Sequence, residues 1–193
     1  SPVRQRVLLK SYASLESLKP SPESSFHVLQ DDNFQSLSNW YYYAILECLE
    51  LKDFEPSATW IWKRLGISSI DANVALERLK RLGMIEFSQG KFKDLTGGKT
   101  SALSKELTSS ARREHQRQIL QKAIDALETV DISRRDQSSM TFAVDTNDLP
   151  KVKELIKQFR RKLSKFVNDA SLKDEVYNLS LSFYPVSKTL EGK

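Results

Sequence analysis

Seven polar side chains between residues 69 and 93 have the chemistry to contact a polyanion. They comprise one hydroxyl, one amide and five cations: Ser69, Asn73, Arg78, Lys80, Arg81, Lys91 and Lys93. An asparagine amide can hydrogen-bond to the edge of adenine, and lysine and arginine neutralise phosphates. These residues are therefore candidate contacts to duplex DNA. The alternative is that they form the solvated surface of a structural scaffold.

A second group of cations lies between residues 151 and 165, where seven basic side chains accompany one acid, Glu154. Within this run, Lys157, Arg160 and Arg161 are candidates for binding an anion, either the phosphates of DNA or an anionic effector. The alternative is a solvated helix face that lies opposite an apolar stripe.

The other reactive residue types do not form a catalytic or metal-binding pattern. Cys48 is the only cysteine, and its apolar sequence neighbours favour a buried structural role. His115 lacks an evident partner, and two histidines with one cysteine cannot make an ordinary zinc site. The segment 97–100 ends like a phosphate-binding loop but lacks the upstream glycine. We therefore predict that the chain is not an enzyme and uses no cofactor or metal.

Apolar periodicity predicts three helices and a hairpin before residue 98. The helices are expected over residues 36–51, 58–65 and 67–82, and the strands over 84–87 and 91–95. Ser57 is suited to cap the second helix, and Ser68 or Ser69 the third, while Gly66 permits a positive φ where the second helix ends. Three helices followed by a hairpin is the order of a winged helix-turn-helix.

The sequence after residue 98 predicts a second alternation of helix and strand. We expect helices over 104–130 and 149–167, and strands over 140–144 and 176–184. The last strand, helix and strand would form a right-handed parallel crossover. The predicted fold class is α+β, with an N-terminal arm or linker at 1–34, a winged-helix domain at 35–98, and an αβαβ domain at 99–188 for effector binding or dimerisation.

The net charge of +5 lies entirely in residues 99–193, which hold eighteen basic and thirteen acidic side chains. Residues 35–98 hold eight of each, so the candidate DNA contacts lie in a region of zero net charge. No apolar run reaches the roughly 18 residues that a membrane span requires, and the N-terminus has no signal-peptide pattern. We predict a soluble, cytoplasmic protein with no membrane partner.

The stretch from residue 60 to residue 85 resembles the helix-turn-helix of winged-helix transcription regulators. The matching positions are Ile61, Leu65, Gly66, Ile67, Ser68, Leu76, Leu79, Gly83, Met84 and Ile85. Trp62 departs from the pattern, since those proteins usually have alanine there, and Asp71 would face phosphates unfavourably. The resemblance implies a DNA-binding regulator that dimerises, with the long helix at 104–130 as a dimer element.

Residues 35–188 are also similar to the C-terminal domain of unknown function of an uncharacterised family of bacterial regulators. The landmarks are the segments 39–42, 60–81, 115–116, 123–127, 138–141, 159–163 and 176–179. Members of that family carry an N-terminal Cro-like helix-turn-helix, which we do not find in residues 1–34. Because the chain also lacks a starting Met, we expect a fragment or a processed chain, and the removal of a Cro-like domain stays an open alternative. Two functions stay open: a DNA-binding regulator, and a protein-interaction or effector-sensing domain that keeps the winged helix as a scaffold.

Overall fold

The computed structural model describes residues 37–97 and 110–188, which we call the N-terminal unit and the C-terminal unit. The N-terminal unit contains α3 (Tyr41–Cys48), α4 (Ala58–Leu65), α5 (Ser69–Arg81), β1 (Ile85–Ser88) and β2 (Lys91–Asp94). The C-terminal unit contains α6 (Ser110–Thr129), the short 3-10 helices Ile132–Arg134 and Thr146–Asp148, and α7 (Leu149–Asn168). Helices and a small antiparallel sheet agree with the predicted α+β class. The predicted arm at 1–34 lies outside the described residues.

A single apolar core holds the N-terminal unit together. Ile61 of α4 and Leu79 of α5 are fully buried, and Ile45 of α3 meets them. The apolar positions on each helix recur at intervals of three and four residues, which places them on one face. The core is completed by Leu37, Tyr42, Leu46, Ala72, Ala75, Leu76, Met84 and Ile85, and by Ala111 of α6.

The turn between α4 and α5 follows from two capping residues. Gly66 ends α4 in the left-handed conformation, with φ of 65°, which residues with a β-carbon seldom adopt. Ser57 caps the start of α4, because its hydroxyl accepts a hydrogen bond from the Trp60 amide at 3.1 Å. Ser68, rather than Ser69, caps α5 in the same way.

The hairpin packs against α5 and turns at two residues with positive φ. Its register pairs Glu86 with Lys93 and Phe87 with Phe92. The turn lies at Gln89 and Gly90, whose φ angles are 51° and 74°, as a two-residue hairpin turn requires.

The first helix differs from its prediction. It begins at Tyr41 and ends at Cys48, although the apolar pattern predicted residues 36–51. Trp40 is its N-cap residue and makes no side-chain capping bond.

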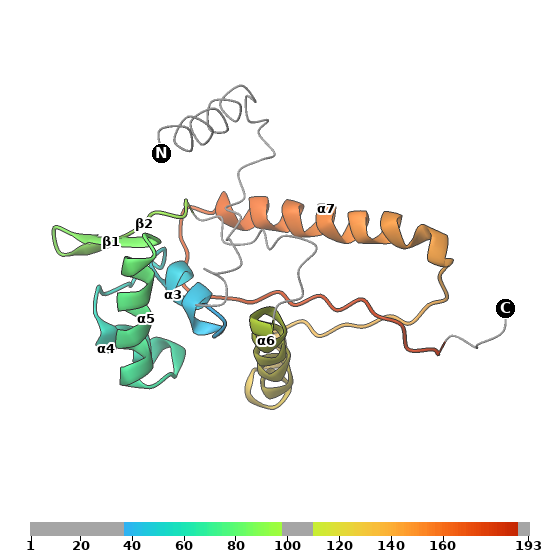
Figure 1. Ribbon diagram of the computed structural model, residues 1–193, viewed down its shortest axis with the longest axis horizontal. Helices are drawn as coiled ribbons and strands as arrows, with labels where there is room; N and C mark the ends of the chain where they lie inside the picture. Colours follow the sequence, from blue (N-terminus) through green and yellow to red (C-terminus); the bar gives the residue numbers. More distant parts are fainter. Residues whose placement is uncertain (1–36, 98–109, 189–193) are drawn as a thin grey trace, which may run out of the picture.

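Helix α6 lies beside α3 at the edge of the N-terminal unit, and α7 extends away from that unit (Figure 1). Tyr43 meets His115 edge to face, with ring centroids 5.2 Å apart. The Lys122 ammonium lies 3.6 Å from the centre of the Trp40 ring, and the Trp40 amide donates to the Gln118 side chain at 3.1 Å. The cluster of aromatic residues at 40–43 therefore divides between the core and the contact with α6.

The two strands predicted in the C-terminal unit are not formed. Residues 140–144 and 176–184 are assigned no strand, and the sheet consists of β1 and β2 alone among the described residues. The two segments still run in the same direction beside α7, as a crossover would have them (Figure 1). Phe142 and Phe183 stack with centroids 6.3 Å apart. The sequence pattern identified amphipathic extended segments, but the described part of the chain does not form the hydrogen bonds that define strands there.

Residues 173–175 tie the C-terminal unit to the N-terminal unit. The Lys52 amide donates to the Lys173 carbonyl at 2.9 Å. The carboxylate of Glu175 lies 3.7 Å from the Arg64 guanidinium and 3.3 Å from that of Arg134. Arg134 thus pairs with Glu175.

Candidate nucleic-acid interface

The first turns of α5 present an exposed face. Ser69 and Asn73 are exposed on it, and the apolar side chains of Ile70 and Val74 beside them are 74% and 49% exposed. The opposite face of the same helix enters the core through Ala72, Ala75, Leu76 and Leu79. The amphipathic pattern of α5 therefore fixes which side chains the fold leaves for a partner.

Asp71 lies in the first turn of α5 but is held within the cap. The Ser68 hydroxyl donates to its carboxylate at 2.6 Å and accepts from its amide at 3.0 Å. The Tyr41 hydroxyl also donates to it, at 3.4 Å. The Asp71 carboxylate is therefore half-buried and is hydrogen-bonded by Ser68 and Tyr41 within the chain. It also lies where the helix dipole favours negative charge.

The amide of Asn73 is exposed but already hydrogen-bonded. Its Nδ2 donates to the Ser69 carbonyl at 2.8 Å, one helical turn earlier. A bond of this kind at an exposed site exchanges readily with other acceptors, since its net stabilisation is only about 1 kcal/mol. Asn73 can therefore turn outward to a ligand at little cost.

Two of the predicted cations are engaged by the fold. The Arg78 guanidinium donates to the Tyr42 hydroxyl at 3.1 Å and lies 5.8 Å from the centre of that ring. The Lys80 ammonium pairs with Glu77 at 2.8 Å and lies over the rings of Phe87 and Phe92. These two side chains support the helix and the hairpin.

The other three cations are exposed. Arg81 lies at the end of α5, and Lys91 and Lys93 lie on β2. In the strand register, Lys93 lies opposite Glu86, and Lys91 lies opposite Ser88. Both lysines are therefore on the hairpin face that points away from Phe87 and Phe92. None of the three forms an ion pair with any residue in 37–97 or 110–188.

The model of one protein family, a domain of unknown function designated DUF4423, matches residues 20–186. The chain belongs to this family. No curated protein and no solved structure gives a significant match. The DUF4423 match contains every candidate contact residue, and it begins at residue 20, whereas the sequence resemblance placed the start near residue 35.

The second cationic group of the DUF4423 domain lies on α7. Lys157 is 3.2 Å from the Glu154 carboxylate, so its charge is partly compensated. Arg160 is exposed, and Arg161, one residue further, is half-buried. Positions 157, 160 and 161 are neighbours on the helix surface, which keeps the three cations close enough to share one anion.

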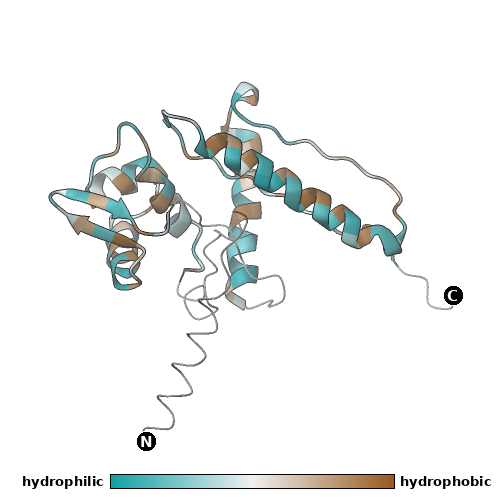
Figure 2. Ribbon diagram, turned by 90° about the horizontal axis from the view of Figure 1, so that it is seen from above, coloured by the Kyte–Doolittle hydropathy of each residue, from teal (hydrophilic) through white to brown (hydrophobic). Residues whose placement is uncertain are grey.

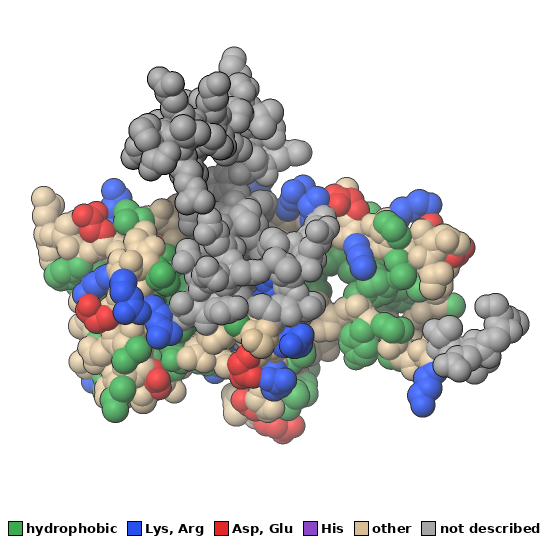
Figure 3. All heavy atoms as spheres, in the orientation of Figure 1, with side chains coloured by type: hydrophobic (Ala, Val, Ile, Leu, Met, Phe, Trp, Pro, Cys, Tyr) green, Lys and Arg blue, Asp and Glu red, His purple; other side chains and the backbone are tan. Residues whose placement is uncertain are grey.

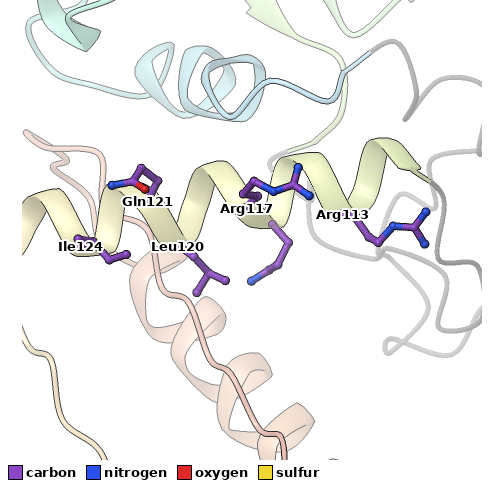
Figure 4. Close-up of a pocket in the computed structure, with 6 residues that line it drawn as sticks. Arg113, Arg117, Leu120, Gln121 and Ile124 are labelled. Carbon is purple, nitrogen blue, oxygen red and sulfur yellow. The ribbon is translucent and has the colours of Figure 1, made fainter.

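A shallow hollow on α6 presents further cations that the sequence analysis did not single out. Figure 4 shows Arg113 and Arg117 beside Leu120, Gln121 and Ile124 on this helix. Arg117 is paired with Glu114. Basic residues at 113 and 117 recur one turn apart, and this spacing could have revealed them.

Burial shifts the pKa values of Cys48 and His115 in this domain. Burial raises the pKa of Cys48 to about 12, which keeps the thiol protonated and unreactive, as predicted from its apolar context. Burial also lowers the pKa of His115. Within residues 37–97 and 110–188, no three histidine, cysteine or carboxylate side chains gather as a metal site would require. No described helix is long and apolar enough to cross a membrane.

Sequence reasoning missed two residues that organise this interface. Tyr42 accepts the Arg78 hydrogen bond across 36 positions of sequence, and no local pattern indicates that contact. Tyr41 reaches Asp71 across 30 positions. Both tyrosines belong to the aromatic cluster at 40–43, whose contacts depend on how α3 packs against α5.

Proposed function

We propose that this chain is a module of a bacterial transcription regulator that binds duplex DNA through a winged helix-turn-helix at residues 57–94. The module acts in the cytoplasm and catalyses no reaction. In this proposal α5 enters the major groove, and the hairpin of β1 and β2 lies along the phosphate backbone.

The observation that carries the proposal is that the front of α5 and the outer face of β2 are both exposed. Ser69 and Asn73 offer hydrogen bonds to base edges, and the exposed Ile70 and Val74 suit contact with thymine methyl groups. Asp71 is the one acid in the first turn of α5, and its carboxylate is hydrogen-bonded by the Ser68 hydroxyl.

The cations divide into two roles. Arg81, Lys91 and Lys93 are exposed and contact phosphates directly. Arg78 and Lys80 are held by Tyr42 and Glu77, so they position the helix and the hairpin instead. Of the five cations that the sequence analysis named as candidate DNA contacts, the proposal therefore keeps three as direct phosphate contacts.

The test is the salt dependence of binding to a mixed-sequence DNA duplex, followed by fluorescence anisotropy. Each phosphate contact adds about 0.9 to the magnitude of the slope of log affinity against log salt. Replacing Arg81, Lys91 and Lys93 together by alanine should therefore lower that magnitude by about two to three and weaken binding at every salt concentration.

A matched control removes the same charge elsewhere. Lys153, Lys162 and Lys165 are exposed on α7, and their replacement by alanine changes the net charge equally. That variant should keep the slope of the unmodified chain. Absence of binding at low salt, or an equal loss in both triple variants, would contradict the proposal.

A second candidate function is a protein-interaction or effector-sensing domain that keeps the same fold as a scaffold. It is favoured by the equal numbers of basic and acidic residues in 35–98 and by the engagement of Arg78 and Lys80 within the chain. In that case the apolar pair Ile70 and Val74 would contact a protein. Binding that is absent with DNA at low salt would favour this candidate.

A further inference from the structure

The C-terminal unit leaves most of its large apolar side chains in contact with solvent. Seventeen of them are between 39% and 82% exposed in residues 110–188, and Ala111 is the only buried apolar residue there. Figure 2 shows hydrophobic residues along both α6 and α7. A unit with this composition has not completed its core.

Helix α7 shows this most directly. Its apolar stripe follows helical spacing, with Val152, Ile156 and Leu163 half-buried along one edge. Along the other edge, Phe159 and Phe166 are exposed. Because none of the twenty residues of α7 is buried, one edge of the stripe lacks a covering surface. In Figure 3, hydrophobic side chains gather over α7 and the segments beneath it.

The extended segments lack partners for their backbone as well. Residues 138–144 and 176–186 make no backbone hydrogen bonds among the described residues. Tyr177, Leu179, Leu181 and Phe183 alternate with polar residues, as in a strand with one covered face. A segment of this kind is a template for pairing with another strand.

We infer that a second copy of this chain completes the C-terminal unit. The 176–184 segments of the two copies pair antiparallel about a two-fold axis, and the exposed edges of the two α7 helices cover the resulting sheet. A two-fold axis relates identical segments in opposite directions, so it supplies each segment with an antiparallel partner that residues 37–97 and 110–188 of its own chain do not provide.

The exposed area is sufficient for such a dimer. Eight of the seventeen exposed apolar side chains lie on α7 or in 176–184, where the two copies would meet. Since a fully exposed aromatic side chain presents on the order of 150 Å² or more, these eight partly exposed side chains offer on the order of 600 Å² per chain. A stable interface needs about 800 Å² from each partner, and the backbone and polar side chains of the same two elements supply the rest.

A second copy would cover the exposed apolar side chains and also bond to the backbone of 176–184, whereas a membrane would do only the first. A lipid surface could cover Phe159 and Phe166, but it offers no partners to the backbone of 176–184. The inference does not rest on DNA binding, since none of the residues involved lies in 69–93.

The test is the mass of the full 193-residue chain, measured by light scattering or sedimentation equilibrium over a range of concentrations. The expected mass is twice the 22.1 kDa of one chain. The variant carrying Phe159→Glu and Leu179→Glu should raise the dimer dissociation constant at least about 100-fold, as expected for the loss of central contacts. Both positions are about half exposed in the single chain, so the change should leave the monomer folded.

The matched control carries Gln158→Glu and Asn178→Glu, which introduce the same charges at the adjacent exposed polar positions. It should remain dimeric. Amide exchange of 176–184 should be slow in the unmodified chain and in the control, and fast in the Phe159→Glu, Leu179→Glu variant. A monomer at every concentration, fast exchange in the unmodified chain, or capture of a monomeric chain by lipid vesicles would each overturn the inference.

Discussion

Three arginine and lysine side chains at the end of α5 carry the same charge but differ in what surrounds them. Arg78 is half-buried against Tyr42, and Lys80 lies over the two hairpin phenylalanines, whereas Arg81 is exposed. At this scale, the type of residue says which contacts are chemically available. The packing around it determines whether the contact is made within the chain or with a partner.

Replacing Arg78 by alanine should lower the free energy of unfolding by about 1 kcal/mol, because its hydrogen bond and its contact with the Tyr42 ring are lost. The Arg81→Ala change should alter that free energy by less than about 0.5 kcal/mol. Urea unfolding followed by circular dichroism measures both. Equal losses for the two variants would show that Arg78 is not held as the structure has it.

The capping hydroxyl of Ser68 gives a second prediction at this scale. Ser68→Ala should cost about 1 kcal/mol of unfolding free energy, since the Asp71 amide and carboxylate both lose a partner. Ser69→Ala, one position later, serves as the control and should change stability by less than about 0.5 kcal/mol. If Ser69→Ala is the more damaging change, the cap has been assigned to the wrong serine.

At the scale of elements, the hairpin turn forms with a residue at position 89 that is not the most favourable one for its backbone conformation. Gln89 adopts a φ of 51° in a two-residue turn, a conformation that asparagine tolerates better. Gln89→Asn should therefore raise the thermal midpoint slightly, corresponding to a few tenths of a kcal/mol. Gln89→Val should lower it, because a β-branched residue fits this conformation poorly. A lower midpoint for the asparagine variant would contradict the turn geometry.

The contact between α3 and α6 should make stability depend on pH. Burial holds the pKa of His115 below its ordinary value of 6.5, so the unfolded chain takes up this proton at a higher pH than the folded protein does. As the pH falls from about 7 to about 5, the free energy of unfolding should therefore decrease. His115→Phe keeps a ring against Tyr43 and should flatten this dependence in urea unfolding. An unchanged slope would place the titrating group elsewhere.

The elements themselves were predicted unequally well, for physical reasons. The glycine break at Gly66 and the cap of α4 depend on neighbours within one or two helical turns, and the sequence predicted them. The partner of Arg78 depends on a contact between distant segments, so local spacing could not predict it. Apolar and polar residues alternate in the segments at 140–144 and 176–184, as they do in strands. This alternation indicates that one face of the segment is covered, but it does not indicate that another strand pairs with it.

At the scale of the whole molecule, the two units differ in how complete they are. The N-terminal unit buries most of its large apolar side chains within one chain, whereas the C-terminal unit exposes most of them. If a second copy completes the C-terminal unit, the thermal midpoint of the chain should rise with protein concentration, because association stabilises the folded state by mass action. The Phe159→Glu, Leu179→Glu variant should show a midpoint that does not vary with concentration. Differential scanning fluorimetry across a dilution series measures both.

The hydrogen bond from Lys52 to Lys173 and the position of Glu175 between Arg64 and Arg134 have a consequence for limited proteolysis. A protease that cut the chain between residues 97 and 110 would generate two polypeptides that are still joined by this segment and by the seat of α6 on α3. The two fragments should elute together from a sizing column under native conditions and separate only in denaturant.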